Sequence, residues 1–261
     1  MSNSATVSAV EWEALAWPDI AATLDACGHT VLWPFGATEQ HGPHLGCGVD
    51  SVIADAVCKA VSAWTRVPVL PCMTLGLSSG HSRRWSGTLS LSAQTLIAVV
   101  ADTADWLVAS GVKRIILVNA HVTNFAPLRC ALEGIRARHD GVMVTLISTA
   151  EISARVRQEF FSDGNDWHAN AAETALMMHL RPGMVVGDRV ATADDPDRTL
   201  GLEFAHPVNA TSSNGVTGYP SRATTEDGER LFSWMVDDLS LRVTAAMNEQ
   251  PPLPFSYHSN K

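Results

Sequence analysis

The stretch HTVLWPFGATEQHGPHLGCGVD, residues 29–50, decides the fold. Residues 29–34 are a short apolar run with β-branched members, which is typical of a buried strand. A loop with four glycines follows, and residues 51–64 then show the apolar period of a helix. The loop and the helix start carry Glu39, His41, His44 and Asp50. Strand, polar loop and helix in this order indicate a parallel α/β sheet.

The same alternation continues along the chain. Further strands are predicted at 67–71, 112–119 and 142–148, and further helices at 92–111, 125–141, 170–180 and 224–248. Ser92 and Gly111 have the residue types that start and stop a helix, whereas Gly228 weakens the last one. We expect helices on both faces of a mostly parallel sheet.

One long segment interrupts this alternation of strands and helices. Residues 187–223 are rich in Gly, Pro, Asp, Ser and Thr and are predicted to form long loops. We expect a single domain over residues 1–261, with a short tail at about 250–261.

Composition excludes several classes of protein. The 261 residues are 46% hydrophobic and carry a net charge of −9, which disfavours nucleic-acid binding. The five cysteines form no CxxC pair, so neither a disulfide framework nor a thiolate zinc site is expected. The chain shows no run of about 18 apolar residues and no signal-peptide pattern at its start, which predicts a cytoplasmic protein without membrane association.

Two polar clusters follow two of the predicted strands. GATEQHGPH comes after residues 29–34, and NAHVTN comes after residues 112–119. Because ligands of open parallel sheets bind beyond the carboxyl ends of the strands, both clusters are expected on one rim of the sheet.

Glu39 and His41 are candidate metal ligands. One residue separates them, so on an extended segment their side chains point the same way, and a carboxylate beside an imidazole suits a divalent metal. Asp50 can return to the same site and bridge two ions, and His121, at the end of a strand, can add a ligand. The alternative is a glycine-rich loop whose polar residues cap turns.

A third cluster, DWHANAAET, spans residues 166–174. His168 is a candidate general acid or base or a hydrogen-bonded loop residue, and Glu173 can bind a metal or stabilise the start of a helix. His44 is a candidate for orienting the loop. The candidate substrate-binding residues are His81, Trp85, Asn119, Thr123, Asn124 and Trp167. The other histidines are predicted to be structural: His29, His139, His179, His206 and His258.

A competing interpretation comes from GLSSG, residues 76–80. It matches the G-x-S-x-G elbow of serine hydrolases, which would make Ser78 a nucleophile. The elbow requires a helix immediately after the serine, and HSRRWSGTLS is a poor helix start. The sequence also lacks a Walker A motif and a G-x-G-x-x-G motif after a strand.

The chain resembles the creatininase family of metal-dependent amidohydrolases. The segments that carry the resemblance are LAWPDI, PFGATEQHGPHL with Asp50, GHSRRWSGTLSLS, VNAHVTNFAPL, HANAAETALMM and GVTGYPSRATTEDGERL. They run in the family's order over about residues 15–231. The resemblance implies a three-layer α/β/α sandwich, a site for two divalent metal ions (Zn²⁺, Mn²⁺ or Fe²⁺) and a homo-oligomer such as a hexamer.

The resemblance also implies roles for single residues. It makes Glu39 and His41 ligands of different ions, Asp50 the bridge, His121 a further ligand and His168 the proton-transferring histidine. Creatininase has a metal-binding glutamate where this chain has Thr123, so Glu173 becomes the completing carboxylate with a role in catalysis.

The implied activity is hydrolysis of a C–N bond in a small molecule: an amide, a cyclic amide or a formamide. Gly46 and Cys47, where relatives have Pro and Leu, argue against creatinine itself as the substrate. The alternatives are a cyclic ketone or another substrate of creatininase-like proteins, such as one in the maturation of peptide-derived cofactors, and a binding protein without catalysis.

Overall fold

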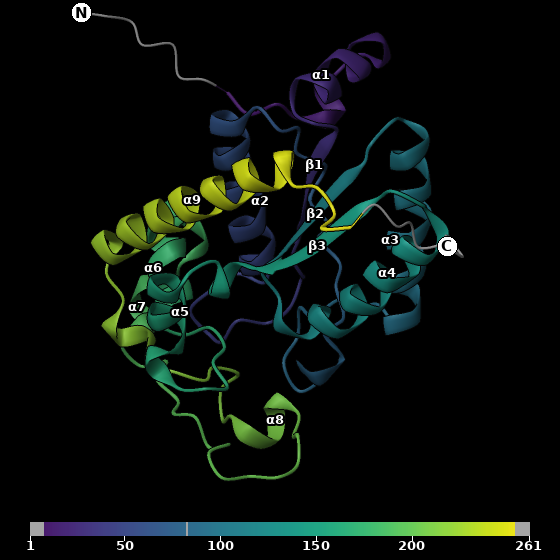
Figure 1. Ribbon diagram of the computed structural model, residues 1–261. Helices are drawn as coiled ribbons and strands as arrows, with labels where there is room; N and C mark the ends of the chain where they lie inside the picture. Colours follow the sequence, from purple (N-terminus) through teal and green to yellow (C-terminus); the bar gives the residue numbers. More distant parts are fainter. Residues whose placement is uncertain (1–7, 82, 254–261) are drawn as a thin grey trace, which may run out of the picture.

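The fold is built on a parallel sheet of three strands. The computed structural model describes residues 8–81 and 83–253, so residues 254–261 of the predicted tail, with His258, lie outside the described part. The strands are β1 (Thr30–Phe35), β2 (Arg114–Asn119) and β3 (Met143–Ser148), side by side in the order β1-β2-β3 (Figure 1). All six residues of β1 are buried, as expected for a strand covered on both faces.

The predicted strand 67–71 is reduced to bridges. Val69 pairs in parallel with Leu32 of β1, and Leu70 N–H donates to the Leu32 carbonyl. Pro68 and Pro71 have no backbone N–H to donate, which prevents a longer ladder. The segment therefore lies along the edge of β1 without forming a regular strand.

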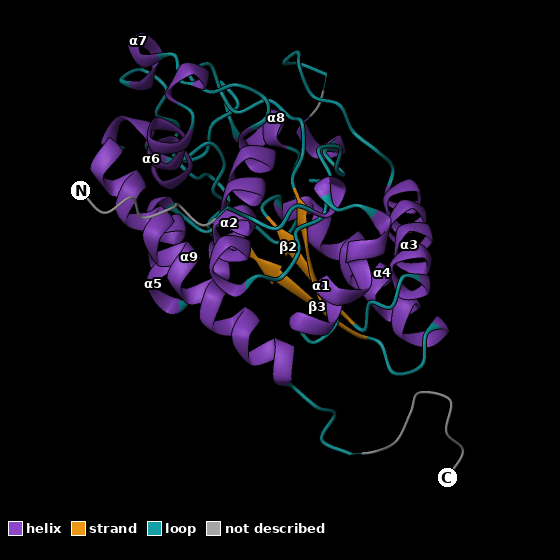
Figure 2. Cartoon of the chain, turned by 90° about the horizontal axis from the view of Figure 1, so that it is seen from above, coloured by secondary structure: helices purple, strands orange, loops and turns teal. Residues whose placement is uncertain are grey.

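Helices cover both faces of the sheet, as Figure 2 shows. One face is covered by α2 (Val49–Thr65), α5 (Ala154–Phe160), α6 (Ala171–Leu180) and α9 (Thr225–Asn248). The other face is covered by α1 (Ile20–Ala26), α3 (Ala93–Ala109) and α4 (Phe125–Arg138). The fold is thus the predicted α/β/α arrangement, with one apolar core on each side of the sheet.

The long helices begin and end close to the predicted residues. The hydroxyl of Ser92 accepts the backbone N–H of Thr95 and so caps α3, and Gly111 takes a positive φ of 99° just after that helix. Gly228 proves to be required rather than merely tolerated in α9. A Cβ atom at this position would overlap the carbonyl oxygen of Ala175 in α6, so the two helices pack closely only because residue 228 is glycine.

The segment 187–223 is mostly loop, as predicted. It contains only α7 (Gly187–Val190), α8 (Val208–Thr211) and a 3₁₀ turn. The 3₁₀ turns of the described residues are Trp12–Ala14, Trp17–Asp19, Ser79–His81, Val122–Asn124, Thr149–Glu151, Phe161–Asp163, Pro182–Met184 and Pro220–Arg222. Within the described residues, no helix combines the length and the apolar character needed to cross a bilayer.

Candidate metal centre

The carboxyl ends of β1 and β2 bring together five buried acidic and imidazole side chains. Glu39 and His41 lie on the loop after β1, Asp50 lies in the first turn of α2, His121 follows β2, and Glu173 lies in the first turn of α6. Each of the five residues is no more than 4% exposed. The sheet edge predicted to carry the site therefore does gather these residues.

Asp50 is shared by two of the three groups of possible metal ligands among the described residues. One group combines Asp50 with Glu39 and His121, and another combines it with His41 and Glu173. The third consists of Glu39, His41 and His168. Within each group the potential ligand atoms lie within 4.8 Å of one another. Two adjacent positions with a common carboxylate have the arrangement of a two-metal site.

Interatomic distances define the two positions. In the first, Nδ1 of His121 lies 3.2 Å from Oε1 of Glu39 and 3.4 Å from Oδ2 of Asp50. In the second, Nε2 of His41 lies 3.4 Å from Oδ1 of Asp50 and 3.7 Å from Oε1 of Glu173. Glu39 thus lies at the first position and His41 at the second, although one residue separates them and both also belong to the group with His168.

Backbone carbonyls orient both imidazole rings. His41 Nδ1 lies 3.1 Å from the Glu39 carbonyl oxygen, and His121 Nε2 lies 2.8 Å from the Leu77 carbonyl oxygen. A carbonyl only accepts, so each of these nitrogens carries a proton. The other nitrogen faces the carboxylates and can offer its lone pair to a cation that displaces its proton, which is how metal-binding histidines are held.

Several buried polar atoms of this site have no hydrogen-bond partner in the protein. They are Glu39 Oε2, His41 Nε2 and Asp50 Oδ2. Leaving such groups unpaired in the interior costs free energy, and cations bound at the two positions would satisfy all three atoms. The donor set of carboxylate oxygens and imidazole nitrogens suits zinc, manganese or iron.

Without cations, these groups strongly perturb one another. Burial lowers the pKa of His121, but the Glu39 carboxylate beside it prevails and raises that pKa to about 9. Burial, together with Glu39, raises the pKa of Asp50 to about 6 despite His41. Perturbed groups of both signs concentrated in one cavity are typical of a functional site.

His168 faces the same cluster. Its Nε2 donates to the Gln40 carbonyl oxygen at 2.8 Å, and its Nδ1 lies 3.7 Å from Oε1 of Glu39. Burial, followed by the neighbouring His41 and His81, lowers the pKa of His168 well below its usual value, so the ring is neutral at pH 7. A neutral ring with a free Nδ1 in the cavity can accept a proton.

The two carboxylate oxygens of Glu173 face different partners. Its Oε2 accepts the backbone N–H of Ala169 at 2.6 Å, while its Oε1 faces His41. Asn170 caps α6 by accepting the N–H of Glu173. Ala169 has a positive φ of 50°, a strained value for a residue with a Cβ atom, and its N–H donates to Glu173 in this conformation.

A cavity of about 450 Å³ opens onto this cluster. Four of the six predicted substrate-binding residues line it, namely His81, Asn119, Thr123 and Trp167. Trp167 packs against Phe160 and Phe161, with ring centroids 5.0 and 5.9 Å apart, and these contacts fix the indole in the wall.

Asn124 and Trp85, the other two predicted substrate-binding residues, are not among the residues that line this cavity. Asn124 is fully buried, donates to the Gly36 carbonyl oxygen at 2.9 Å and accepts the N–H of Leu77 at 2.8 Å, so its amide joins two loops. Trp85 instead lies against the guanidinium group of Arg84.

Two of the residues that line the cavity also form hydrogen bonds to His121. Asn119 receives the backbone N–H of His121 and donates to its carbonyl oxygen, and the Thr123 hydroxyl contacts His121 Nε2. Both residues therefore hold His121 in place as well as lining the cavity. His44 is likewise buried, with Nε2 2.9 Å from the Thr174 hydroxyl, as expected of a residue that orients the loop.

His206 was predicted to be structural but lines the cavity, together with Pro207 and Val208. Nothing in its local sequence marks it, because the long loop 195–207 brings it there from a distance.

Ser78 is close to His121 but poorly placed to act as a nucleophile. Its hydroxyl lies 3.3 Å from His121 Nε2, the nitrogen that already donates to the Leu77 carbonyl oxygen and so cannot take the serine proton. Among the described residues, it is followed by a three-residue 3₁₀ turn, Ser79–His81, and Ser78 is 1% exposed. This geometry does not support the serine-hydrolase interpretation.

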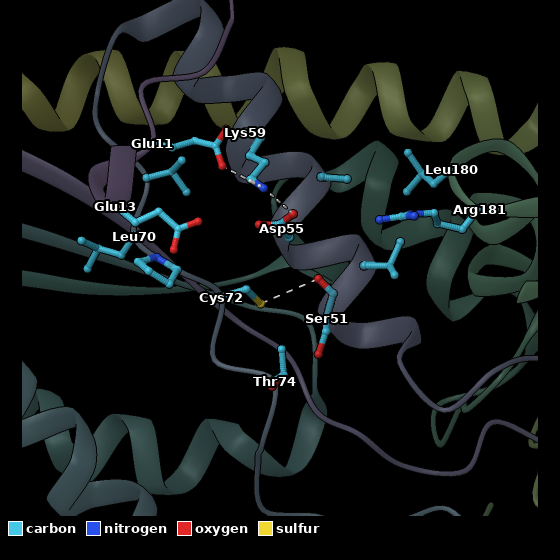
Figure 3. A pocket seen from close by; sticks show the side chains of 14 residues that line it. Glu11, Glu13, Ser51, Asp55, Lys59, Leu70, Cys72, Thr74, Leu180 and Arg181 are labelled. Carbon is cyan, nitrogen blue, oxygen red and sulfur yellow. Dashed lines mark hydrogen bonds and ion pairs between the residues drawn. The ribbon is translucent and has the colours of Figure 1, made fainter. Parts of the chain in front are cut away.

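A second cavity, of about 400 Å³, lies beside α2 (Figure 3). Its charged groups largely neutralise each other, since Lys59 lies 3.1 Å from both Glu11 and Asp55. No member of the three possible metal-ligand groups lines this cavity. The catalytic chemistry is therefore expected in the first cavity.

Comparison with known proteins agrees with this geometry. A family model described as creatininase, creatinine amidohydrolase, matches residues 13–243. The chain belongs to the creatininase family. It is accordingly a creatininase-family hydrolase, and its parallel sheet with flanking helices is the fold of that family.

Individual relatives differ in what they act on. The chain is 30% identical over 224 residues to a mycofactocin precursor peptide peptidase of Mycobacterium ulcerans, covering 82% of this chain and 84% of the relative. It is also 30% identical over 258 residues to a creatinine amidohydrolase of Pseudomonas putida, covering 91% and 96%. Two solved structures, a zinc–zinc form of a creatininase mutant and a manganese creatininase, each superpose on this chain with a TM-score of 0.80 at 28% identity. Each alignment covers 92% of this chain, together with 99% of the mutant and 100% of the manganese enzyme.

Proposed function

We propose that this creatininase-family hydrolase cleaves an amide C–N bond and depends on two divalent metal ions. The observation that carries the proposal is the sharing of Asp50 between two groups of buried ligands. Glu39 and His121 would complete the first position, and His41 and Glu173 the second. The unpaired atoms of Glu39, His41 and Asp50 support this ligand set.

When bound, the two ions would supply Lewis acidity and lower the pKa of a water molecule towards neutrality. Residues of the protein transfer the proton and surround the substrate. His168 holds its neutral Nδ1 towards the cluster and can carry a proton to the departing nitrogen. Trp167, His81 and Asn119 shape the cavity around the substrate.

Two kinds of amide substrate fit the site. A small amide, cyclic amide or formamide is the first, because the cavity of about 450 Å³ has the size of small-molecule sites. The second is an amide bond of a peptide, favoured by the peptidase relative. A cyclic ketone would need the same ions but no proton for a leaving nitrogen.

Metal-dependent turnover of a defined panel tests the proposal. The panel holds small cyclic amides, linear formamides, short peptides and cyclic ketones, assayed with protein stripped by a chelator and reloaded separately with Zn²⁺, Mn²⁺ or Fe²⁺. We expect hydrolysis of at least one amide class by reloaded protein and none by stripped protein. Full activity of the stripped protein would rule the proposal out.

We also propose that the chain forms a single domain, because both apolar cores share one sheet, and that it assembles as a homo-oligomer. Sedimentation at several concentrations tests the assembly, and a mass of 28.0 kDa at all of them would contradict it.

A further inference from the structure

Gln40, which stands between Glu39 and His41 in the sequence, has a buried side chain beside His81 and His168. It is 4% exposed and links the loop after β1 to the loop around residue 215. Its own chemistry excludes a role as a strong metal ligand beside carboxylates and imidazoles, and the mechanism above does not use it.

The orientation of the Gln40 amide is fixed by two backbone groups. Its Oε1 accepts the N–H of Gly42 at 2.9 Å, and its Nε2 donates to the Gly215 carbonyl oxygen at 3.0 Å. Because the first partner only donates and the second only accepts, the amide has one arrangement here. A Cβ atom at residue 215 would overlap Gln40 Oε1, so the loop leaves just enough room for this amide.

The second N–H of Gln40 has two imidazole nitrogens within reach. His168 Nε2 lies at 3.3 Å, but it donates to the Gln40 carbonyl oxygen and cannot accept another proton. His81 Nδ1 lies at 3.2 Å and remains as the acceptor. The proton of the neutral His81 ring must then be on Nε2.

His81 Nε2 lies 3.2 Å from Oε1 of Glu39, so its N–H points at that carboxylate. This is the reverse of His41 and His121, whose carbonyl-bound N–H groups point away from the cluster and whose other nitrogens face it as candidate ligands. His81 therefore differs from the ligand histidines in tautomer, although it touches the same carboxylate.

We infer that Gln40 is a positioning residue that fixes the tautomer of His81, so that His81 donates a hydrogen bond to the ligand Glu39 instead of binding a metal ion or the substrate. The expected effect on metal affinity rests on the proposed metal site, whereas the tautomer of His81 is a property of the protein alone. A hydrogen bond to a ligating carboxylate orients it, and loss of such partners typically lowers metal affinity by about 10–100-fold.

The first test reads the tautomer directly. Protein with ¹⁵N-labelled histidine, loaded with Zn²⁺, is studied by long-range ¹H–¹⁵N correlation NMR, and the His81 signals are assigned by their absence in His81→Gln. We expect Nε2 protonated and Nδ1 unprotonated. A protonated Nδ1 overturns the inference. The same spectrum of metal-free protein reads the tautomer even if no metal binds, so failure of the metal proposal is recognised separately.

The second test asks whether Gln40 acts through His81. Gln40→Glu replaces the donating nitrogen by oxygen, so the His81 proton should move to Nδ1 and zinc affinity, measured by chelator competition, should fall about 10-fold or more. In His81→Gln, the new glutamine amide supplies an N–H near the position of His81 Nε2, and this N–H is present with either Gln or Glu at residue 40. In that background we expect Gln40→Glu to change zinc affinity much less.

An equal loss of affinity in both backgrounds would mean that Gln40 acts only on the structure, and would overturn the inference. Gln94→Glu, the same change at an exposed position of α3, is the matched control and should leave zinc affinity unchanged. If Gln40→Glu does not fold, the wild-type tautomer measurement still decides the central claim.

Discussion

The Oδ2 atom of Asp50 lies 3.4 Å from Nδ1 of His121, and both side chains are buried. The other oxygen of Asp50 faces His41 at the same distance. Asp50→Asn removes the charge that both positions share, so we expect the metal content to fall from about two ions per chain to less than one. Elemental analysis of protein dialysed against Zn²⁺ measures this, and two retained ions would contradict the bridging role.

Glu173→Gln should affect one position only. Its Oε1 faces His41, whereas Glu39, Asp50 and His121 form a group without it. We expect one ion per chain to be retained and activity to fall sharply, because one ion remains where two are needed. Comparison of Asp50→Asn with Glu173→Gln therefore distinguishes the two metal positions. Equal loss of both ions in Glu173→Gln would show that the two positions cannot be occupied independently.

His168→Asn tests proton transfer apart from metal binding. The ring faces the cavity with a free Nδ1, and general acid–base catalysis contributes about 10²–10⁴-fold. We expect kcat to fall within this range while the metal content stays at the wild-type value. Steady-state kinetics on the substrate found in the panel, paired with metal analysis of the same sample, gives the answer. An unchanged kcat would remove His168 from the mechanism.

The sequence could predict the parts of this protein that depend on local patterns. Apolar periods located β1, β2 and β3 within about two residues, and Ser92 marked the start of α3, because these features are decided by neighbours along the chain. Placement of both polar clusters at one sheet edge followed from the rule for parallel strands.

Features that depend on contacts between distant segments could not be predicted from local sequence patterns. The tautomer of His81 depends on Gln40 and Gly215, and His206 reaches the cavity only through a long loop. Asn124 has the residue type and position of a substrate contact, yet its amide joins Gly36 and Leu77. Residue type alone cannot distinguish a side chain that faces a cavity from one that supports its wall.

Gly228 is another such feature, and it gives a prediction about stability. A methyl group at residue 228 would overlap the backbone of Ala175, which cannot move without shifting α6 and, with it, Glu173. We expect Gly228→Ala to lower the free energy of unfolding by about 2 kcal/mol or more, as overpacking does. Guanidinium unfolding monitored by circular dichroism measures the change.

Gly134→Ala in α4 is the matched control. Within the described residues nothing lies within 4 Å of a Cβ atom there, so the alanine should stabilise the helix by about 0.5–1 kcal/mol. If both substitutions have effects of the same sign, close packing of α9 on α6 is not what requires glycine at residue 228.

Asp195 links the long loop to the site and makes stability depend on acid pH. Burial raises the pKa of Asp195, but hydrogen bonds from Arg198, Ser212 and Ser213 prevail and lower it to about 2. The backbone of Asp195 also pairs with Gly218, next to the Thr217 that pairs with His168. Loss of this carboxylate's hydrogen bonds would therefore loosen the wall behind His168.

The sign of the effect follows from the lowered pKa. The folded state holds the Asp195 proton less tightly than the unfolded state, so its contribution, about 1 kcal/mol once solvent screening is allowed for, is present above pH 4 and is lost as the pH falls towards 2. Asp195→Asn should lower the free energy of unfolding at pH 7 by about this amount and flatten its decline below pH 4. Guanidinium titrations at pH 7, 5, 4 and 3 measure both effects. Asp102→Asn, the same change at an exposed position of α3, should leave the slope unaltered, and an equal slope in Asp195→Asn and wild type would mean that other carboxylates cause the acid sensitivity.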